Sequence, residues 1–399
     1  MKALQDVVRF RLKLVPITAL TVGSGRTLGR FDYTLTVNPR SGSPLIRVLD
    51  MERFLEDGKI PPEKKIEAIE KRQSATLDRF SRYVLSCAFQ EAKEGIELVE
   101  FHRDAEGRPL IPASALRGLI RTAVAFAALR REPQALWEGI EGALEGRWRR
   151  EGAGHRLERR LFGSSQEDPL RALSIGESEG GSNEDLKACE VAVMNLEGFS
   201  FRQKLSFFAE ALAPSARPSF AFDAAVDRSR LGRRVEDQRS PPPAAPGSGA
   251  PAPAASTVPT AHAGGPGGRP AAVDVSGVAA HLWGREEILA ALRALSAAII
   301  DGERRFYVDV GARDLGRTFE EVLRRADGRI ALPFGFGGGW RGKTMGALFG
   351  PGELHRLEPL LSPGRPYLRN GPRPIFPKTR RWVLDRFRPA EPFGWTVVE

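Results

Sequence analysis

The amino-acid sequence predicts an α+β fold, in which short strands and helices are interleaved along the chain. One observation is the strict alternation of polar and apolar residues in short segments, which is clearest at 8–14 (Val-Arg-Phe-Arg-Leu-Lys-Leu). Another is the helical spacing of apolar residues over longer segments, such as 114–130. The β-α-β order is compatible with ferredoxin-like halves, an arrangement common among RNA-binding modules.

The first part of the chain is expected to form strands around a glycine-rich turn. Residues 8–14 predict a half-buried strand, and the turn Val-Gly-Ser-Gly-Arg-Thr-Leu-Gly follows at 22–29. Apolar patches at 33–37 and 46–49 predict two more strands.

The next part is expected to be mainly helical. Apolar residues recur at helical spacing over 61–88, and this pattern predicts one long helix with Cys87 on its buried stripe. A strand is expected at 96–101. It is followed by a helix over 114–130 and a charged helix over 134–150.

Two predicted strands, at 189–196 and 218–226, precede an interruption of the pattern. Of the 35 residues at 238–272, 25 are Pro, Gly or Ala. Such a composition shows no periodicity and favours a disordered segment or linker.

After this interruption we expect a helix at 277–300, a strand at 306–310 and a helix at 314–326. The organisation is therefore an N-terminal core with a helical insertion over 1–237, the linker, and a C-terminal α+β part over 273–399 that completes the fold.

Composition indicates an anionic partner. The 399 residues include 49 Arg, 11 Lys and 50 acidic residues, which gives a net charge of +10. Dispersed arginine favours nucleic acid, because guanidinium groups bind phosphate bidentately and stack on bases; a basic surface without such a role is the plain alternative. Outside the Pro/Gly/Ala-rich segment 238–272, no stretch of about 18 residues is free of charge, so no membrane span is expected. With only Cys87 and Cys189, neither a zinc site nor a disulfide framework is expected, and the cytoplasm is the default compartment.

The segment 337–344 (Gly-Gly-Gly-Trp-Arg-Gly-Lys-Thr) matches the P-loop pattern literally. A P-loop needs a buried strand before it and a long helix after it. Here Pro333 precedes it, and Gly346 and Gly350 follow it closely. A cradle for a nucleic-acid phosphate, or a tight turn that needs glycine, are the alternatives.

Two weaker motifs also have anion-binding character. The turn that starts at Gly23 lacks dinucleotide-binding spacing, because Gly29 comes one residue late, and a hairpin or bulge is its simple explanation. A helix is expected to start near Ser114, and this side chain is expected to cap the exposed N–H groups of the first turn. Such N–H groups attract anions. Arg117 and Arg121 share one helix face, which is either an RNA-binding face or a solvated basic one.

The sequence contains few groups of residues that could form a catalytic site. The five histidines form no recognisable metal or nucleophile pattern, and His102 and His281 are expected to be structural. Asp32 is an isolated carboxylate without an identifiable partner. We therefore expect no catalytic residue, no metal and no cofactor.

Together, Gly23-Ser24-Gly25, the helix start at 110–123, and the late segments Gly335–Trp340 and Lys343-Thr344 resemble the RAMP superfamily of CRISPR effector proteins. Within it, the sequence looks like the fifth Csm subunit of type III-A systems. The resemblance implies a modified RRM-like (ferredoxin-like) core with helical insertions, without nuclease activity. It also implies a place at the 3′ end of the CRISPR RNA, with target RNA, a backbone RAMP subunit and the small subunit as partners.

Individual positions of this sequence match the motif residues of the family, and three positions differ from the family pattern. The family often has His where Thr21 stands, Gly where Ala113 stands and Ser where Ala115 stands. The residues expected to bind RNA are Gly23, Ser24, Gly25, Arg26, Ser114, Arg117, Arg121, Gly337, Gly338, Gly339, Trp340, Arg341 and Lys343. Trp340 is either a base-stacking platform or a buried anchor. The rival hypotheses are a RAMP endoribonuclease that uses Asp32 or a histidine, a type III-B RAMP subunit and a P-loop ATPase.

Overall fold

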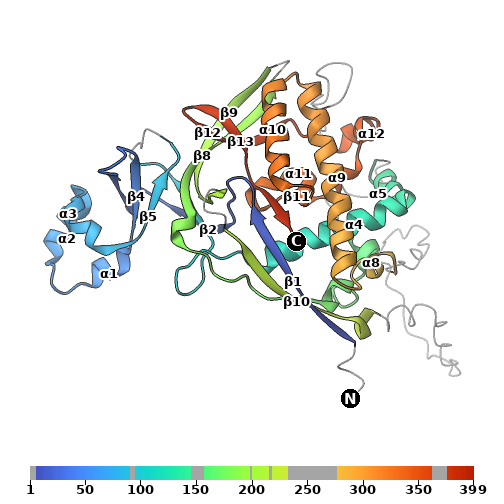
Figure 1. Ribbon diagram of the computed structural model, residues 1–399, viewed down its shortest axis with the longest axis horizontal. Helices are drawn as coiled ribbons and strands as arrows, with labels where there is room; N and C mark the ends of the chain where they lie inside the picture. Colours follow the sequence, from blue (N-terminus) through green and yellow to red (C-terminus); the bar gives the residue numbers. More distant parts are fainter. Residues whose placement is uncertain are drawn as a thin grey trace, which may run out of the picture.

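The chain folds into two sheets and a group of helices, as predicted for an α+β protein (Figure 1). The computed structural model describes residues 6–89, 95–144, 157–197, 200–214, 218–231, 276–361 and 375–399. The segment expected to be disordered, 238–272, lies outside the described residues, as does the end of the predicted helix at 134–150. None of the described helices is long and apolar enough to cross a membrane.

One sheet has five antiparallel strands and joins the two ends of the chain. Its order is β11 (Ile330–Pro333), β14 (Trp395–Val398), β1 (Val7–Pro16), β10 (Phe220–Asp227) and β7 (Leu173–Ile175). The alternation read from the sequence explains β1 and β10. Leu12 and Leu14 lie opposite Phe222 and Phe220, and all four are buried on one face.

The other sheet is curved and has nine strands (Figure 1). Its main path is β2 (Gly23–Leu28), β6 (Leu98–Phe101), β9 (Ser200–Leu212), β8 (Leu186–Glu197), β5 (Ser81–Cys87), β4 (Pro44–Leu49) and β3 (Tyr33–Val37). The strand β12 (Thr379–Asp385) pairs with β8 and with β13 (Arg388–Pro392). The long β8–β9 hairpin forms the centre of this sheet, and the sequence pattern did not identify β9.

Three helices pack beside the five-stranded sheet. They are α4 (Ala113–Arg131), α9 (Arg285–Asp309) and α10 (Arg313–Ala326). The helix α4 packs on α9, and α9 packs on β11, where Ser296 donates a hydrogen bond of 2.6 Å to the carbonyl of Ala331. Shorter helices surround them, namely α5 (Pro133–Leu144), α8 (Ser276–Ala280), α11 (Gly339–Lys343) and α12 (Pro351–Leu361).

A small lobe projects from the strands β3, β4 and β5 (blue in Figure 1). It contains α1 (Met51–Glu56), α2 (Pro62–Glu70) and α3 (Ser74–Leu77). Phe54 and Phe80 meet edge to face at 5.2 Å in its separate core, which also contains Leu49, Ala68 and Leu77. This lobe therefore has its own hydrophobic support.

Two predicted elements are wrong. The helix predicted over 61–88 ends at Glu70, and 81–87 form the strand β5, in which Tyr83 and Leu85 are buried between exposed neighbours. The strand predicted at 306–310 belongs instead to α9, which continues to Asp309, because helical packing buries Phe306 and Tyr307 together and leaves Val308 77% exposed. The helix predicted at 277–300 is divided into α8 and α9.

Candidate functional site

Three motifs that are far apart in the sequence line one cavity of about 400 Å³, called here the glycine-motif cavity. Gly23 comes from β2, and Ser114 and Gly118 come from the first turns of α4. Gly338 and Lys343 come from the glycine-rich loop. The structure therefore brings members of all three predicted motifs together.

The face of α4 that lines this cavity carries small side chains. Ser114, Gly118 and Thr122 recur every four residues and so lie on one face. The expectation that Ser114 caps the helix is wrong. The N-cap is Pro112, and Ser114 lies inside the first turn with an exposed side chain. The first N–H, that of Ala113, already donates to the Glu177 carboxylate at 2.7 Å, so a protein anion occupies this position.

The two arginines on α4 are held by contacts outside the glycine-motif cavity. Arg117 donates to the carbonyl of Leu170 at 2.7 Å. Arg121 pairs with Asp168 at 2.5 Å and stacks 3.7 Å from the ring centre of Phe162. The charge of Arg121 is thus partly neutralised within the protein, and contact of either residue with RNA stays a prediction.

The glycine turn expected at 22–29 is wrong, because Gly23–Leu28 form the strand β2, whose pairing with β6 shifts register between Gly23 and Thr27. Polar side chains fix the backbone of this irregular strand. Ser24 donates to Glu100 at 2.9 Å and accepts the N–H of Arg26 at 3.0 Å. Arg26 pairs with Asp32 at 2.7 Å, and Asp32 also accepts the N–H of Gly29 at 2.8 Å. The expectation of an isolated carboxylate is wrong, because Asp32 has two partners that hold it as a turn-forming side chain.

The glycine-rich loop owes its glycines to close contacts within the protein. Gly335 has a φ of +56° and lies against the carbonyl of Thr21, where a Cβ would overlap. Gly337 lies against the backbone of Phe393 and Gly394. A sustained helix does not follow, since α11 has only five residues, and β11 is an antiparallel edge strand. The loop therefore lacks the surroundings of a P-loop.

Trp340 is a half-buried anchor. Its ring is stacked on Phe349 at 6.1 Å and meets Phe376 edge to face at 4.8 Å. A Cβ at Gly346 would overlap the indole, so this glycine allows the ring to pack on the chain. Of the two roles considered for Trp340, the anchor is the one with observed contacts.

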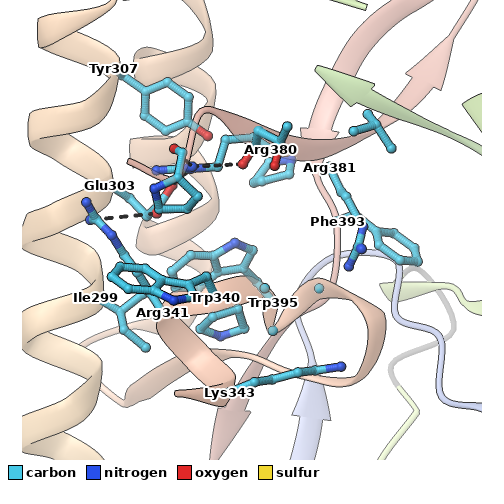
Figure 2. Close-up of a pocket in the computed structure, with 18 residues that line it drawn as sticks. Ile299, Glu303, Tyr307, Trp340, Arg341, Lys343, Arg380, Arg381, Phe393 and Trp395 are labelled. Atoms are coloured by element: carbon cyan, nitrogen blue, oxygen red, sulfur yellow. Dashed lines mark hydrogen bonds and ion pairs between the residues drawn. The ribbon is translucent and has the colours of Figure 1, made fainter. Parts of the chain in front are cut away.

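A second cavity of about 390 Å³, called here the arginine recess, adjoins the glycine loop (Figure 2). Arg341 and Lys343 line it, as do Arg380 and Arg381 from β12. Lys343 belongs to both cavities. Arg380 and Arg381 were not among the predicted site residues, although the excess of basic residues over 341–388 was a signal.

One carboxylate faces these cations. Figure 2 shows Arg341 and Arg380 converging on Glu303, at 3.9 Å and 2.5 Å. Burial lowers the pKa of Arg341 to about 10, an effect that Glu303 opposes and that Arg380 adds to. Burial and the charge of Arg381 lower the pKa of Lys343, and burial lowers that of Arg381. The recess therefore holds positive charge that the protein does not fully compensate.

Comparisons with known proteins agree on one family. Residues 13–242 match the family model of the RAMP superfamily. No curated protein is significantly similar. A chain from the cryo-EM structure of a Csm-crRNA-target RNA ternary complex of a type III-A CRISPR-Cas system shares 19% identity and a TM-score of 0.65, covering 98% of this chain and 100% of that one. Csm5 of T. onnurineus shares 18% identity and a TM-score of 0.60, covering 96% and 99%. At these identities the likeness establishes a shared fold.

Proposed function

Because this chain belongs to the RAMP superfamily, we propose that it is an RNA-binding subunit of a type III-A CRISPR ribonucleoprotein, lying at the 3′ end of the CRISPR RNA. The fold it shares with Csm5 over nearly its whole length supports this assignment. Its partners are then the CRISPR RNA, the target RNA, the backbone RAMP subunit and the small subunit, in the cytoplasm. The similar chain solved in a Csm-crRNA-target RNA complex supports these partners.

The observation that carries the RNA-binding role is the meeting of three motifs at Lys343. This side chain lines both the glycine-motif cavity and the arginine recess. It makes no ion pair with any residue that the structure describes, so its charge is available to a ligand. Small residues on α4 leave the cavity open to a bulky chain such as RNA. A single lysine beside an open cavity suits a phosphodiester backbone.

We also propose that the subunit does not cleave RNA. The carboxylate that a nuclease hypothesis would use, Asp32, is engaged by Arg26 and by the N–H of Gly29. His281 is buried, and burial lowers its pKa. Within the described residues, no three His, Cys, Asp or Glu side chains gather as a metal-binding group. Target cleavage is then the task of another subunit.

The test is the salt dependence of RNA binding by the reconstituted complex. Each phosphate contact to single-stranded RNA contributes a slope of about −0.7 to log K against log salt. Lys343→Ala should weaken binding for all sequences and flatten the slope by about that amount. The matched control is Lys71→Ala, which removes a lysine that pairs with Glu67 in the projecting lobe. Equal slopes for wild type and Lys343→Ala would remove this residue from the RNA site.

A further inference from the structure

The arginine recess has a surplus of positive charge. Four cationic side chains line it, Arg341, Lys343, Arg380 and Arg381, against the single carboxylate of Glu303. The innermost guanidinium groups are shielded from water, since the side chains of Arg341 and Arg380 are 15% and 11% exposed. Burial of unpaired charge is costly, so a partner anion would stabilise this arrangement.

Arg380 has one nitrogen left over. Its Nε donates to Glu303 at 2.5 Å, and its Nη1 donates to the carbonyls of Pro377 and Thr379 at 2.9 and 2.8 Å. Its guanidinium also stacks 3.7 Å from the ring centre of Phe306, which fixes its plane. Its Nη2 is buried and has no hydrogen-bond partner. This pre-positioned, unsatisfied donor belongs to a side chain that lines the recess.

Arg341 is under-satisfied as well. It makes no hydrogen bond with any described residue, and its distance of 3.9 Å from Glu303 is beyond hydrogen-bonding range. It reaches this place only because residue 302, on α9, is a glycine; a Cβ there would overlap the guanidinium. The chain therefore positions a second buried guanidinium beside the first, and the two share Glu303 as their counter-charge.

We propose that the arginine recess binds a terminal phosphate monoester. Guanidinium groups bind phosphate oxygens bidentately, and two such groups, those of Arg341 and Arg380, belong to side chains that line the recess. A phosphate monoester carries nearly two negative charges at pH 7, against one for a phosphodiester, and so matches the surplus better. The volume of about 390 Å³ is at the lower end of the range of small-ligand sites and is sufficient for one nucleotide.

The ligand that fits both cavities is an RNA end. Lys343 lies on the boundary, so a backbone in the glycine-motif cavity can deliver its end to the recess. This identity of the ligand rests on the proposed RNA-binding function. The chemistry alone would equally accept the phosphate of a free nucleoside monophosphate, and the experiment distinguishes these sources.

The test measures binding of the full chain, assembled with the other subunits in the absence of CRISPR RNA, to one ten-nucleotide RNA with a 3′-phosphate, with a 5′-phosphate, or with hydroxyls at both ends. We expect at least one phosphorylated end to bind about tenfold more tightly, the scale of one charge-assisted hydrogen bond. Adenosine monophosphate should compete with the phosphorylated RNA for the recess. If it competes more weakly than the phosphorylated RNA itself does, the ligand is an RNA end. Equal affinity of all three RNAs would overturn the proposal, while failure of the hydroxyl-ended RNA to bind would count against the proposed function instead.

Variants of the recess test whether its arginines cause the tighter binding of RNA with a phosphorylated end. Arg380→Lys keeps the charge but removes the fork, and it should abolish the gain while hydroxyl-ended RNA binds as before. Gly302→Ala should also abolish the gain, because a Cβ at this position would displace Arg341. Gly352→Ala on α12, where a Cβ would meet open space, and Arg324→Gln on α10, whose side chain is 76% exposed, are the matched controls. A gain that survives both recess variants would overturn the proposal.

Discussion

Two adjacent glycines in the same loop should differ strongly in how far the same substitution destabilises the protein. At Gly337, a Cβ would lie 2.6 Å from the Cα of Gly394 and would also overlap the carbonyl of Phe393. Real Cβ atoms do not approach non-bonded atoms within 3.0 Å, and both neighbours are backbone of the β13–β14 turn, which cannot move without disturbing that turn.

At Gly338, the nearest atoms are the Cε and Cγ of Lys343, at 3.0 and 3.1 Å. A flexible, exposed side chain can move away at little cost. The backbone is right-handed helical, with φ −56° and ψ −34°, which alanine adopts readily. Glycine is therefore required at 337 and not at 338.

We expect Gly337→Ala to lower the free energy of unfolding by about 3 kcal/mol, the upper part of the range for overpacking. We expect Gly338→Ala to lie within about 1 kcal/mol of the wild type, because it also restricts the unfolded chain. At about 2–4 °C per kcal/mol, the melting temperature should fall by roughly 6–12 °C for the first and hardly change for the second. Thermal unfolding followed by circular dichroism measures both, and equal losses would refute this reasoning.

Further predictions concern groups away from the loop. Glu210→Ala should cost about 3–5 kcal/mol in urea unfolding, because it leaves the buried guanidinium of Arg103, now 2.8 Å from Glu210, without its counter-charge; an unchanged midpoint would contradict this. Cys87 and Cys189 should react with a thiol reagent at pH 8 only after denaturation, because burial raises the pKa of each to about 12; rapid labelling of the native chain would count against it. Asp32→Ala should leave the target-cleavage pattern of the assembled complex intact, and loss of one cleavage position without loss of assembly would restore the nuclease hypothesis.

Local sequence patterns predicted a strand or helix correctly where only one face of that element is buried. The alternation in β1 and β10 predicted which side chains are internal, and the apolar face of α4 predicted that helix. They failed for β5, where the spacing of Phe80, Val84 and Cys87 also suits a helix. The strand forms because Leu85 pairs with Ile46 of β4 and Cys87 pairs with Ala188 of β8, and such distant pairing leaves no local periodicity.

The candidate site could also be predicted from the sequence only in part. The three motifs were recognised singly, but their common cavity depends on how β2, α4 and the glycine loop pack together. Arg380 and Arg381 reach the recess because β12 pairs with β8, at Met194 and Val193. A basic stretch alone does not say which of its members will be buried.

The proposed function requires that the 3′ part of the CRISPR RNA lies in the glycine-motif cavity. The most direct measurement is photocross-linking of the assembled complex with 4-thiouridine placed at single guide positions, followed by mass spectrometry of the linked peptides. The proposed function predicts that positions near the 3′ end link to peptides containing Ser114 or Lys343, which line that cavity. Links to these peptides from the 5′ part of the guide, or links from the 3′ end only to the projecting lobe, would contradict it.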